Sequence, residues 1–100
     1  MIRGTTPTFT FDTDIDCTQL DLLWVTFLQQ DKEVFTKYLS DCVIDGNVIK
    51  VELTEKDTLM FDHRKNPVEI QLRAGIGKIR TATESMYTEA KRILKDGCLE

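Results

Sequence analysis

Hydrophobic and polar positions alternate along much of this chain, with the period of two residues that is typical of β-strands. The clearest case is residues 48–53, where Ile49, Val51 and Leu53 fall on one face and Lys50 and Glu52 fall on the other. Shorter segments bounded by polar turn residues favour further strands. These segments are residues 8–11, with Phe9 and Phe11 pointing inward, and residues 33–39, 42–45 and 68–74.

The longest apolar run, residues 20–28, has apolar side chains on both of its faces. Its polar interruptions, Asp21 and Thr26, do not fall on one side of a helix, so a strand is favoured. We therefore predict a strand buried on both faces, with Trp24 in the core. A turn at residues 29–32 would join it to residues 33–39 as an antiparallel hairpin.

Turn and cap residues mark the other boundaries. Gly46-Asn47 is a good hairpin turn because both residues tolerate positive φ, and Gly75-Ile76-Gly77 predicts another turn. Thr54, followed three residues later by Asp57, predicts a capped helix of one or two turns.

Residues 78–96 are open to two interpretations. Met86, Ala90, Ile93 and Leu94 have helical spacing, and Gly97 could end a helix. Residues 78–83, however, are strand-like. We favour a strand to about Thr88, followed by a bend that packs Ile93 and Leu94 against the core.

About seven strands and one short helix in 100 residues predict an all-β protein, a β-sandwich formed by a single domain over residues 1–100. Residues 1–7 are polar and predict a flexible lead-in. The final Leu99-Glu100 is compatible with an expression-vector scar.

Charge and cysteine content restrict the partners and the compartment. The net charge is −4 and there is no basic stripe, so we expect neither a nucleic-acid nor a membrane partner. The chain has no apolar run of transmembrane length and no signal peptide, which favours the cytoplasm. Its three cysteines lack CxxC spacing, so free thiols are expected.

No set of residues predicts a metal, a cofactor or catalysis. The triplet Asp12, Asp14 and Asp16 superficially fits a calcium loop, but Cys17 and Leu23 stand where that loop needs glycine and glutamate. A single histidine, His63, excludes a histidine cluster or triad within one chain. The glycines at 75 and 77 lack the spacing of a phosphate loop. Trp24 and Phe27 could stack on bases or sugars, but core packing is the simpler interpretation.

Five segments together carry a family resemblance: MIRGTTPTFTF at 1–11, VTF at 25–27 with Gln29, LTEKDTLMF at 53–61, VEIQLR at 68–73 and ILKDG at 93–97. With these segments the chain resembles a family of small proteins encoded in prophages of Gram-positive bacteria. The resemblance implies a phage structural or assembly component with an immunoglobulin-like sandwich, similar to the N-terminal domains of some baseplate proteins. It assigns no functional residues.

These observations leave two hypotheses for the function. The first is a non-enzymatic prophage structural or assembly domain, in the host cytoplasm or in the virion, that binds other phage structural proteins or itself. The alternative is a small-ligand or carbohydrate-binding module that uses a sandwich face or its loop ends. An enzyme is disfavoured because the chain offers no activated nucleophile.

The segment at residues 8–11 is the candidate interaction site. As a short, uncharged strand after Pro7, it would be an unguarded sheet edge that can accept a strand from a neighbour. The residues are Thr8, Phe9, Thr10 and Phe11. The alternative is that Phe9 and Phe11 only close the core of their own chain.

Overall fold

The computed structural model describes residues 1–99, and Glu100, half of the suspected vector scar, lies outside the described residues. The described chain is an all-β sandwich of two antiparallel sheets with one short helix, α1 (Glu55–Leu59), which confirms the predicted fold class. Two single 3-10 turns, Cys17–Gln19 and Leu39–Asp41, complete the regular structure. The strands are β1 (Thr8–Asp12), β2 (Leu22–Gln29), β3 (Lys32–Tyr38), β4 (Cys42–Asp45), β5 (Val48–Glu52), β6 (Val68–Ile76), β7 (Ile79–Ala82) and β8 (Met86–Thr88).

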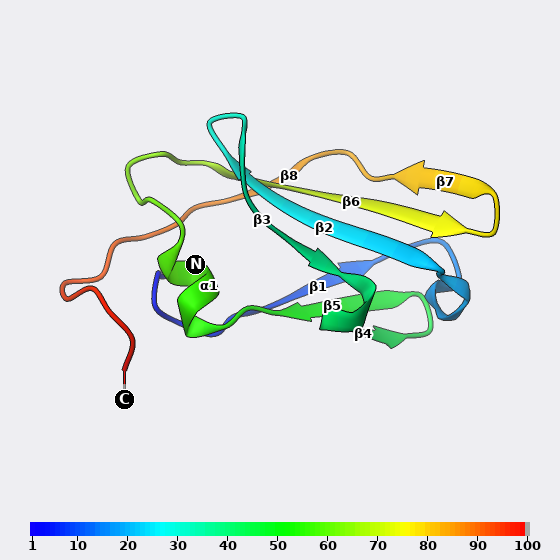
Figure 1. Ribbon diagram of the computed structural model, residues 1–100, viewed down its shortest axis with the longest axis horizontal. Helices are drawn as coiled ribbons and strands as arrows, with labels where there is room; N and C mark the ends of the chain where they lie inside the picture. Colours follow the sequence, from blue (N-terminus) through cyan, green and yellow to red (C-terminus); the bar gives the residue numbers. More distant parts are fainter. Residues whose placement is uncertain (100) are drawn as a thin grey trace.

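The two sheets differ in size, and the strands of the smaller one run below those of the larger one in Figure 1. The smaller sheet has the order β1-β5-β4, and the larger one has the order β3-β2-β6-β7. Strand β8 also pairs with β6, so β7 and β8 lie one after the other along the same edge of β6. The larger sheet therefore has one long free outer face, built mainly on β2 and β6.

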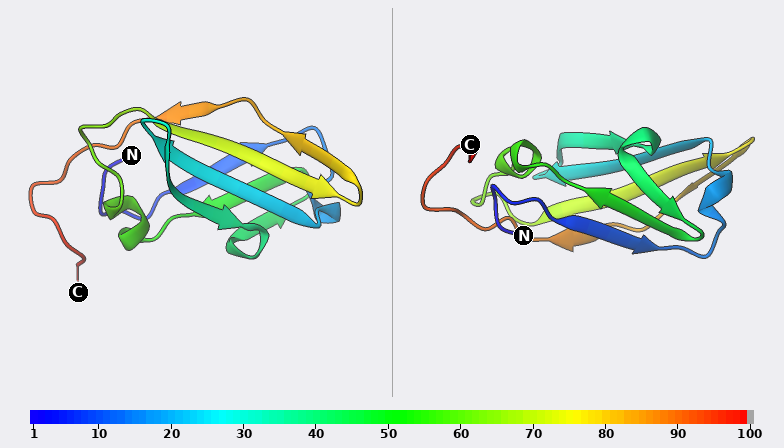
Figure 2. Two further views of the ribbon diagram at one scale, coloured as in Figure 1. Left: turned by 45° about the horizontal axis from the view of Figure 1, so that its top comes forward. Right: turned by 90° about the horizontal axis from the view of Figure 1, so that it is seen from below.

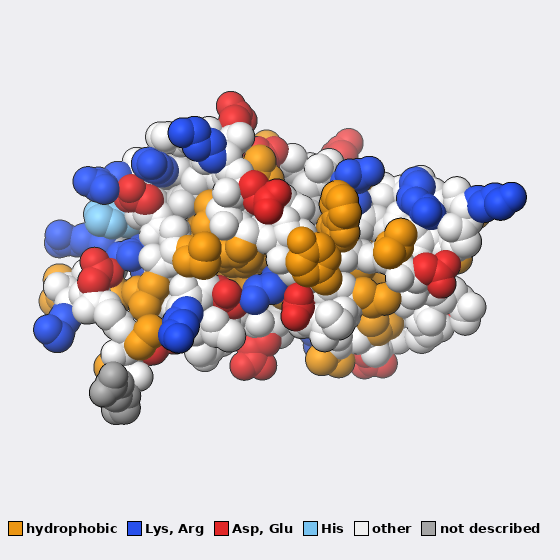
Figure 3. All heavy atoms as spheres, viewed as in Figure 1, with side chains coloured by type: hydrophobic (Ala, Val, Ile, Leu, Met, Phe, Trp, Pro, Cys, Tyr) orange, Lys and Arg blue, Asp and Glu red, His pale blue; other side chains and the backbone are white. Residues whose placement is uncertain are grey.

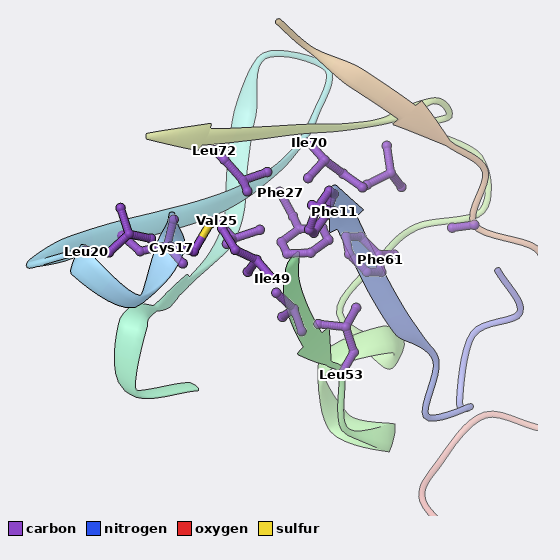
Figure 4. Packing of buried hydrophobic residues seen from close by; sticks show 14 residues of the cluster. Phe11, Cys17, Leu20, Val25, Phe27, Ile49, Leu53, Phe61, Ile70 and Leu72 are labelled. Carbon is purple, nitrogen blue, oxygen red and sulfur yellow. The ribbon is translucent and has the colours of Figure 1, made fainter. Parts of the chain in front are cut away.

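The core fills the space between the sheets, and aromatic rings form its centre (Figure 4). Phe27 of β2 has no exposed surface, and its ring centroid lies 4.8 Å from that of Phe35 on the neighbouring strand β3. The ring of Phe9 from the opposite sheet is 5.9 Å away, and the ring of Phe61, after α1, is 6.0 Å away. Phe27 thus joins both sheets and the segment that follows the helix. The views in Figure 2 show the two layers that this cluster holds together.

Strand β2 is buried on one face only, which corrects the prediction for residues 20–28. Leu23, Val25 and Phe27 point into the core, whereas Leu22 and Trp24 are 51% and 47% exposed. The expectation that Trp24 belongs to the core is therefore wrong. The physical reason is that the smaller sheet covers only the inner face of the larger sheet, and no further layer formed by residues 1–99 covers its outer face.

Local turn signals gave mostly correct predictions. The β4–β5 hairpin turns at Gly46-Asn47 as predicted, with Gly46 at φ 60°. The β2–β3 hairpin turns at Gln30-Asp31, both in the left-handed region, as a two-residue type I′ loop requires. The predicted turn at 75–77 is wrong in position, because β6 continues to Ile76 and the chain turns at Gly77-Lys78.

The predicted capping box at the start of α1 is confirmed. The Thr54 hydroxyl accepts a hydrogen bond from the Asp57 backbone N–H at 3.1 Å, and the Asp57 carboxylate accepts one from the Thr54 N–H at 2.8 Å. The same carboxylate pairs with Lys37 of β3 at 2.8 Å. Asp57 therefore starts the helix and also fixes it to the edge of the larger sheet.

The segment after Gly77 is extended, but it forms two strands where one was predicted. Thr83 interrupts it: its hydroxyl accepts a hydrogen bond from the Leu72 N–H, and its own N–H donates to the Leu72 carbonyl. Ile93 lies against Gly4, in line with the predicted bend. Leu94 is 95% exposed, so the prediction that it packs on the core is wrong.

Residues 1–7, predicted to be a flexible lead-in, make specific contacts at their start. Ile2 forms an isolated parallel bridge with Lys91. The Arg3 guanidinium donates hydrogen bonds to the carbonyls of Phe61 at 2.6 Å and Leu59 at 2.9 Å. Both ends of the described chain and α1 consequently lie at the same end of the sandwich (Figure 1).

Candidate interaction surface

Strand β1, which carries the predicted interaction residues Thr8, Phe9, Thr10 and Phe11, is an edge strand with β5 as its only neighbour among the described strands. The Leu53 N–H donates to the Pro7 carbonyl, and the Thr13 N–H donates to the Asn47 carbonyl. In an antiparallel pair every second residue bonds to the partner strand, so these two bonds show which residues of β1 bond to β5. Phe9 and Phe11 therefore bond to β5, and the backbone groups of Thr8 and Thr10 point away from it.

Some side chains of β1 close the core of their own chain, and others are exposed at the sheet edge. Phe11 is buried and Phe9 is half-buried in the core, so both phenylalanines help to close the sandwich. Thr8 and Thr10 are exposed. Recruitment of a neighbouring strand by this edge stays a prediction.

A second surface, which the sequence prediction missed, lies on the outer face of the larger sheet. Three large side chains there are about half exposed: Leu22 at 51%, Trp24 at 47% and Tyr38 at 52%. Trp24 on β2 and Tyr38 on β3 are direct partners in the strand register. We call these three residues, with Arg73 and Arg80, the Trp24 face. Figure 3 shows hydrophobic side chains gathered over the middle of this sheet, with Lys and Arg side chains beside them towards the β7 end.

Arg73 is the register partner of Trp24 on the other side, on β6. Its guanidinium carbon lies 5.3 Å from the centroid of the indole ring, which is the geometry of a cation–π contact. One face of the indole is thus covered by a cation. The Trp24 side chain nevertheless stays 47% exposed, and the flanking Leu22 and Tyr38 side chains are about half exposed.

Arg80 of β7 lies flat on the sheet because its register partner is Gly75. A Cβ atom at position 75 would come within 2.9 Å of Arg80 Nη1, so any larger residue would displace the guanidinium. The same Nη1 donates to the carbonyls of Gly77 at 2.9 Å and Ile79 at 3.1 Å. The arginine is held in place, and a shallow pocket of about 180 Å³ lies between it, Arg73 and Trp24.

Neither arginine of this face has an acidic partner among residues 1–99. The ion pairs in this part of the chain join Arg3 to Asp96, Lys37 to Asp57 and Arg64 to Asp62. In a protein whose net charge is −4, two guanidinium groups beside an exposed tryptophan form a local positive, partly apolar site. Such a site favours a ligand that offers both carboxylate and apolar groups.

The structure does not arrange Asp12, Asp14 and Asp16 as a cation site. Asp16 accepts hydrogen bonds from the Thr18 backbone N–H at 3.0 Å and from the Thr18 hydroxyl, and these bonds lower the pKa of its carboxyl group. The structure groups no three His, Cys, Asp or Glu side chains of residues 1–99 in a way that could hold a metal ion. His63 is exposed in the loop before β6.

The three cysteines are free thiols with different environments: Cys17 is buried, Cys42 is half-buried and Cys98 is exposed. Burial, with the nearby charge of Asp41, raises the pKa of the Cys42 thiol to about 11. A hydrogen bond with Glu55 raises the pKa of Cys98. A raised pKa disfavours the nucleophilic thiolate form of both groups at neutral pH.

No helix in the described part of the chain has the length and apolar character needed to cross a membrane. Comparisons with protein-family models, curated proteins and solved structures find no match to this chain.

One signal in the sequence could have revealed the Trp24 face. Thr26, a polar residue, has the same parity along β2 as Trp24, which marks that parity as the outward one. The signal was obscured by Gln29, a polar residue of the inward parity that is buried. Gln29 is satisfied there because it donates to the Asp62 carbonyl and accepts from the Asp62 N–H.

Proposed function

We propose that this chain is a non-enzymatic protein-interaction domain and that the Trp24 face is its binding surface. The observation that carries the proposal is the exposed Trp24, which lies between Tyr38 and Arg73 on a hydrogen-bonded sheet. Tryptophan, tyrosine and arginine are the residues most enriched among those that dominate protein–protein binding energy. Strands also hold these side chains in place, which lowers the entropy cost of association.

The family resemblance supports a setting for this activity. In that setting the domain is a prophage-encoded assembly component with an immunoglobulin-like sandwich, and its partners are other phage structural proteins or further copies of itself. The β1 edge, with Thr8 and Thr10 exposed, would be a second contact in such an assembly.

A carbohydrate-binding module is the competing function, and the geometry of Trp24 favours it less. Sugars stack on open aromatic faces, whereas the Arg73 guanidinium already lies over one face of this indole. Protein partners do not need a free ring face, because they can pack against its edge and against Leu22 and Tyr38.

The test is pairwise binding between the purified chain and each protein encoded by the genes beside its own. We expect at least one partner, and Trp24→Ala should weaken its binding by about 30-fold or more, the effect of losing a dominant interface residue. The matched control is Tyr87→Ala, because Tyr87 is 64% exposed on β8, at the far end of the same outer face. This control should change binding by less than about threefold.

Two outcomes would contradict the proposal. One is a partner that binds the Trp24→Ala variant and the wild type equally well. The other is binding to glycans, removed by Trp24→Ala, with no protein partner among the neighbouring gene products. That second result would establish the carbohydrate-binding alternative.

A further inference from the structure

The Trp24 face places a chemical requirement on whatever covers it. Arg73 and Arg80 have no acidic partner among residues 1–99, and Leu22 and Trp24 beside them on β2 are apolar and about half exposed. A purely apolar partner would remove both guanidinium groups from water without replacing their hydrogen bonds, which is unfavourable. The occupant must therefore bring carboxylates and an apolar side chain together.

The chain itself contains a segment of this composition, the acidic loop at residues 12–16 (DTDID). Its apolar residue, Ile15, is 37% exposed and is flanked by aspartates. The carboxylates of Asp12 and Asp14 make no ion pair and accept no hydrogen bond from the described residues, whereas Asp16 is engaged with Thr18. Two unpaired carboxylates beside one isoleucine match two unpaired guanidinium groups beside Leu22 and Trp24.

The acidic loop is also held in a fixed shape, as a binding segment should be. The Thr13 hydroxyl donates to the Asn47 carbonyl at 2.8 Å, and the Asn47 side-chain amide donates to the Thr13 carbonyl at 2.9 Å. The Cys17 backbone N–H donates to the Gly46 carbonyl at 2.9 Å. These bonds hold both ends of the loop against the β4–β5 turn. The loop therefore loses little conformational entropy when it binds.

We propose that the acidic loop of a second copy of this chain binds the Trp24 face, with Asp12 and Asp14 paired to Arg73 and Arg80 and Ile15 packed on Leu22 and Trp24. This inference rests on the proposed function and names its partner. Because the contact joins two different surfaces, each copy offers both. The copies then associate reciprocally as a dimer or head to tail in a ring or filament.

A charge exchange between two variants tests the pairing. The face variant carries Arg73→Glu with Arg80→Glu, and the loop variant carries Asp12→Lys with Asp14→Lys. All four positions are exposed, so both variants should fold, which circular dichroism and a thermal melt would check. Sedimentation velocity should show that the wild type associates at high micromolar concentration and that each variant alone is monomeric.

An equimolar mixture of the two variants should associate again, because the unchanged loop of the face variant then meets the unchanged face of the loop variant, and the two reversed surfaces also have opposite charge. The matched control, Lys50→Glu with Lys56→Glu, changes the net charge as much as the face variant does but lies on other exposed surfaces, and it should associate like the wild type. Added salt should weaken the association of the wild type and of the mixture.

A wild type that stays monomeric at high micromolar concentration would overturn the inference, as would a mixture of the two variants that stays monomeric. Association that survives both variants but is lost in Thr10→Lys would assign the contact to the β1 edge and also overturn it. These results would not contradict the proposed function, because a monomeric wild type could still bind a neighbouring gene product through Trp24.

Discussion

Trp24 and Phe27 lie three residues apart on β2 and point to opposite faces, so truncating each one separates the outer surface from the core. Phe27 has no exposed surface and contacts three other rings, with centroids 4.8 to 6.0 Å away. Replacing such a phenylalanine by alanine costs about 3–5 kcal/mol of unfolding free energy, and its central position favours the upper end.

Trp24→Ala should cost much less, although tryptophan is the larger residue. The lost interactions are the cation–π contact with Arg73, worth about 0.5–1 kcal/mol at an exposed site, and the cross-strand pair with Tyr38, worth about 0.2–1 kcal/mol. The total is about 1–2 kcal/mol. The difference between the two variants should therefore be about 2–4 kcal/mol.

Urea unfolding followed by far-ultraviolet circular dichroism measures both costs. Fluorescence is unsuitable because Trp24 is the only tryptophan. If the Phe27→Ala chain is so destabilised that it is unfolded without urea, a Trp24→Ala chain that still unfolds cooperatively confirms the predicted difference between the two variants. Equal costs for the two variants would refute the assignment of Trp24 to a free outer face.

Three further predictions concern the turn, the helix cap and the thiols. Gln30→Asn with Asp31→Gly should raise the free energy of unfolding by about 1 kcal/mol, measured by urea unfolding, because these residues suit the positive φ angles of the β2–β3 turn. Burial opposes ionisation of Asp57, but hydrogen bonds from Lys37 and Thr54 outweigh it and lower its pKa. The ionised carboxylate therefore stabilises the fold above the unfolded pKa of about 4, and this contribution is lost as the pH falls through the lower folded value. Asp57→Asn should accordingly flatten the acid side of a stability-against-pH curve. Thiol labelling of the folded chain near neutral pH should modify exposed Cys98 first and spare Cys42, whose pKa is about 11, while unfolding in urea should make both react.

Features set by neighbouring residues could be predicted from the sequence. The Thr54–Asp57 capping box and the Gly46-Asn47 turn each depend on a few adjacent residues, and both occur where expected. The strand at 48–53 was equally clear, because its apolar residues all have one parity. For the same reason the number and type of most elements, and hence the sandwich, followed from local patterns.

The positions of Arg73 and Arg80 beside Trp24 could not be predicted, because they depend on pairings between distant parts of the chain. Arg73 reaches Trp24 only through the β2–β6 register, and Arg80 lies flat only because Gly75 is its partner on β6. Whether a second layer covers the outside of β2 is a property of the whole fold, which an apolar run of both parities does not reveal.

The central claim, that Trp24 stands on an open binding face, is tested most directly by quenching the fluorescence of this single tryptophan with acrylamide. We predict that the folded chain, at a concentration low enough to be monomeric, is quenched readily and emits at the long wavelength of a hydrated indole, as expected for a side chain that is 47% exposed. Binding of a partner to the Trp24 face should then shield the indole. Emission at the short wavelength of a buried indole, with little quenching until urea unfolds the chain, would contradict the claim.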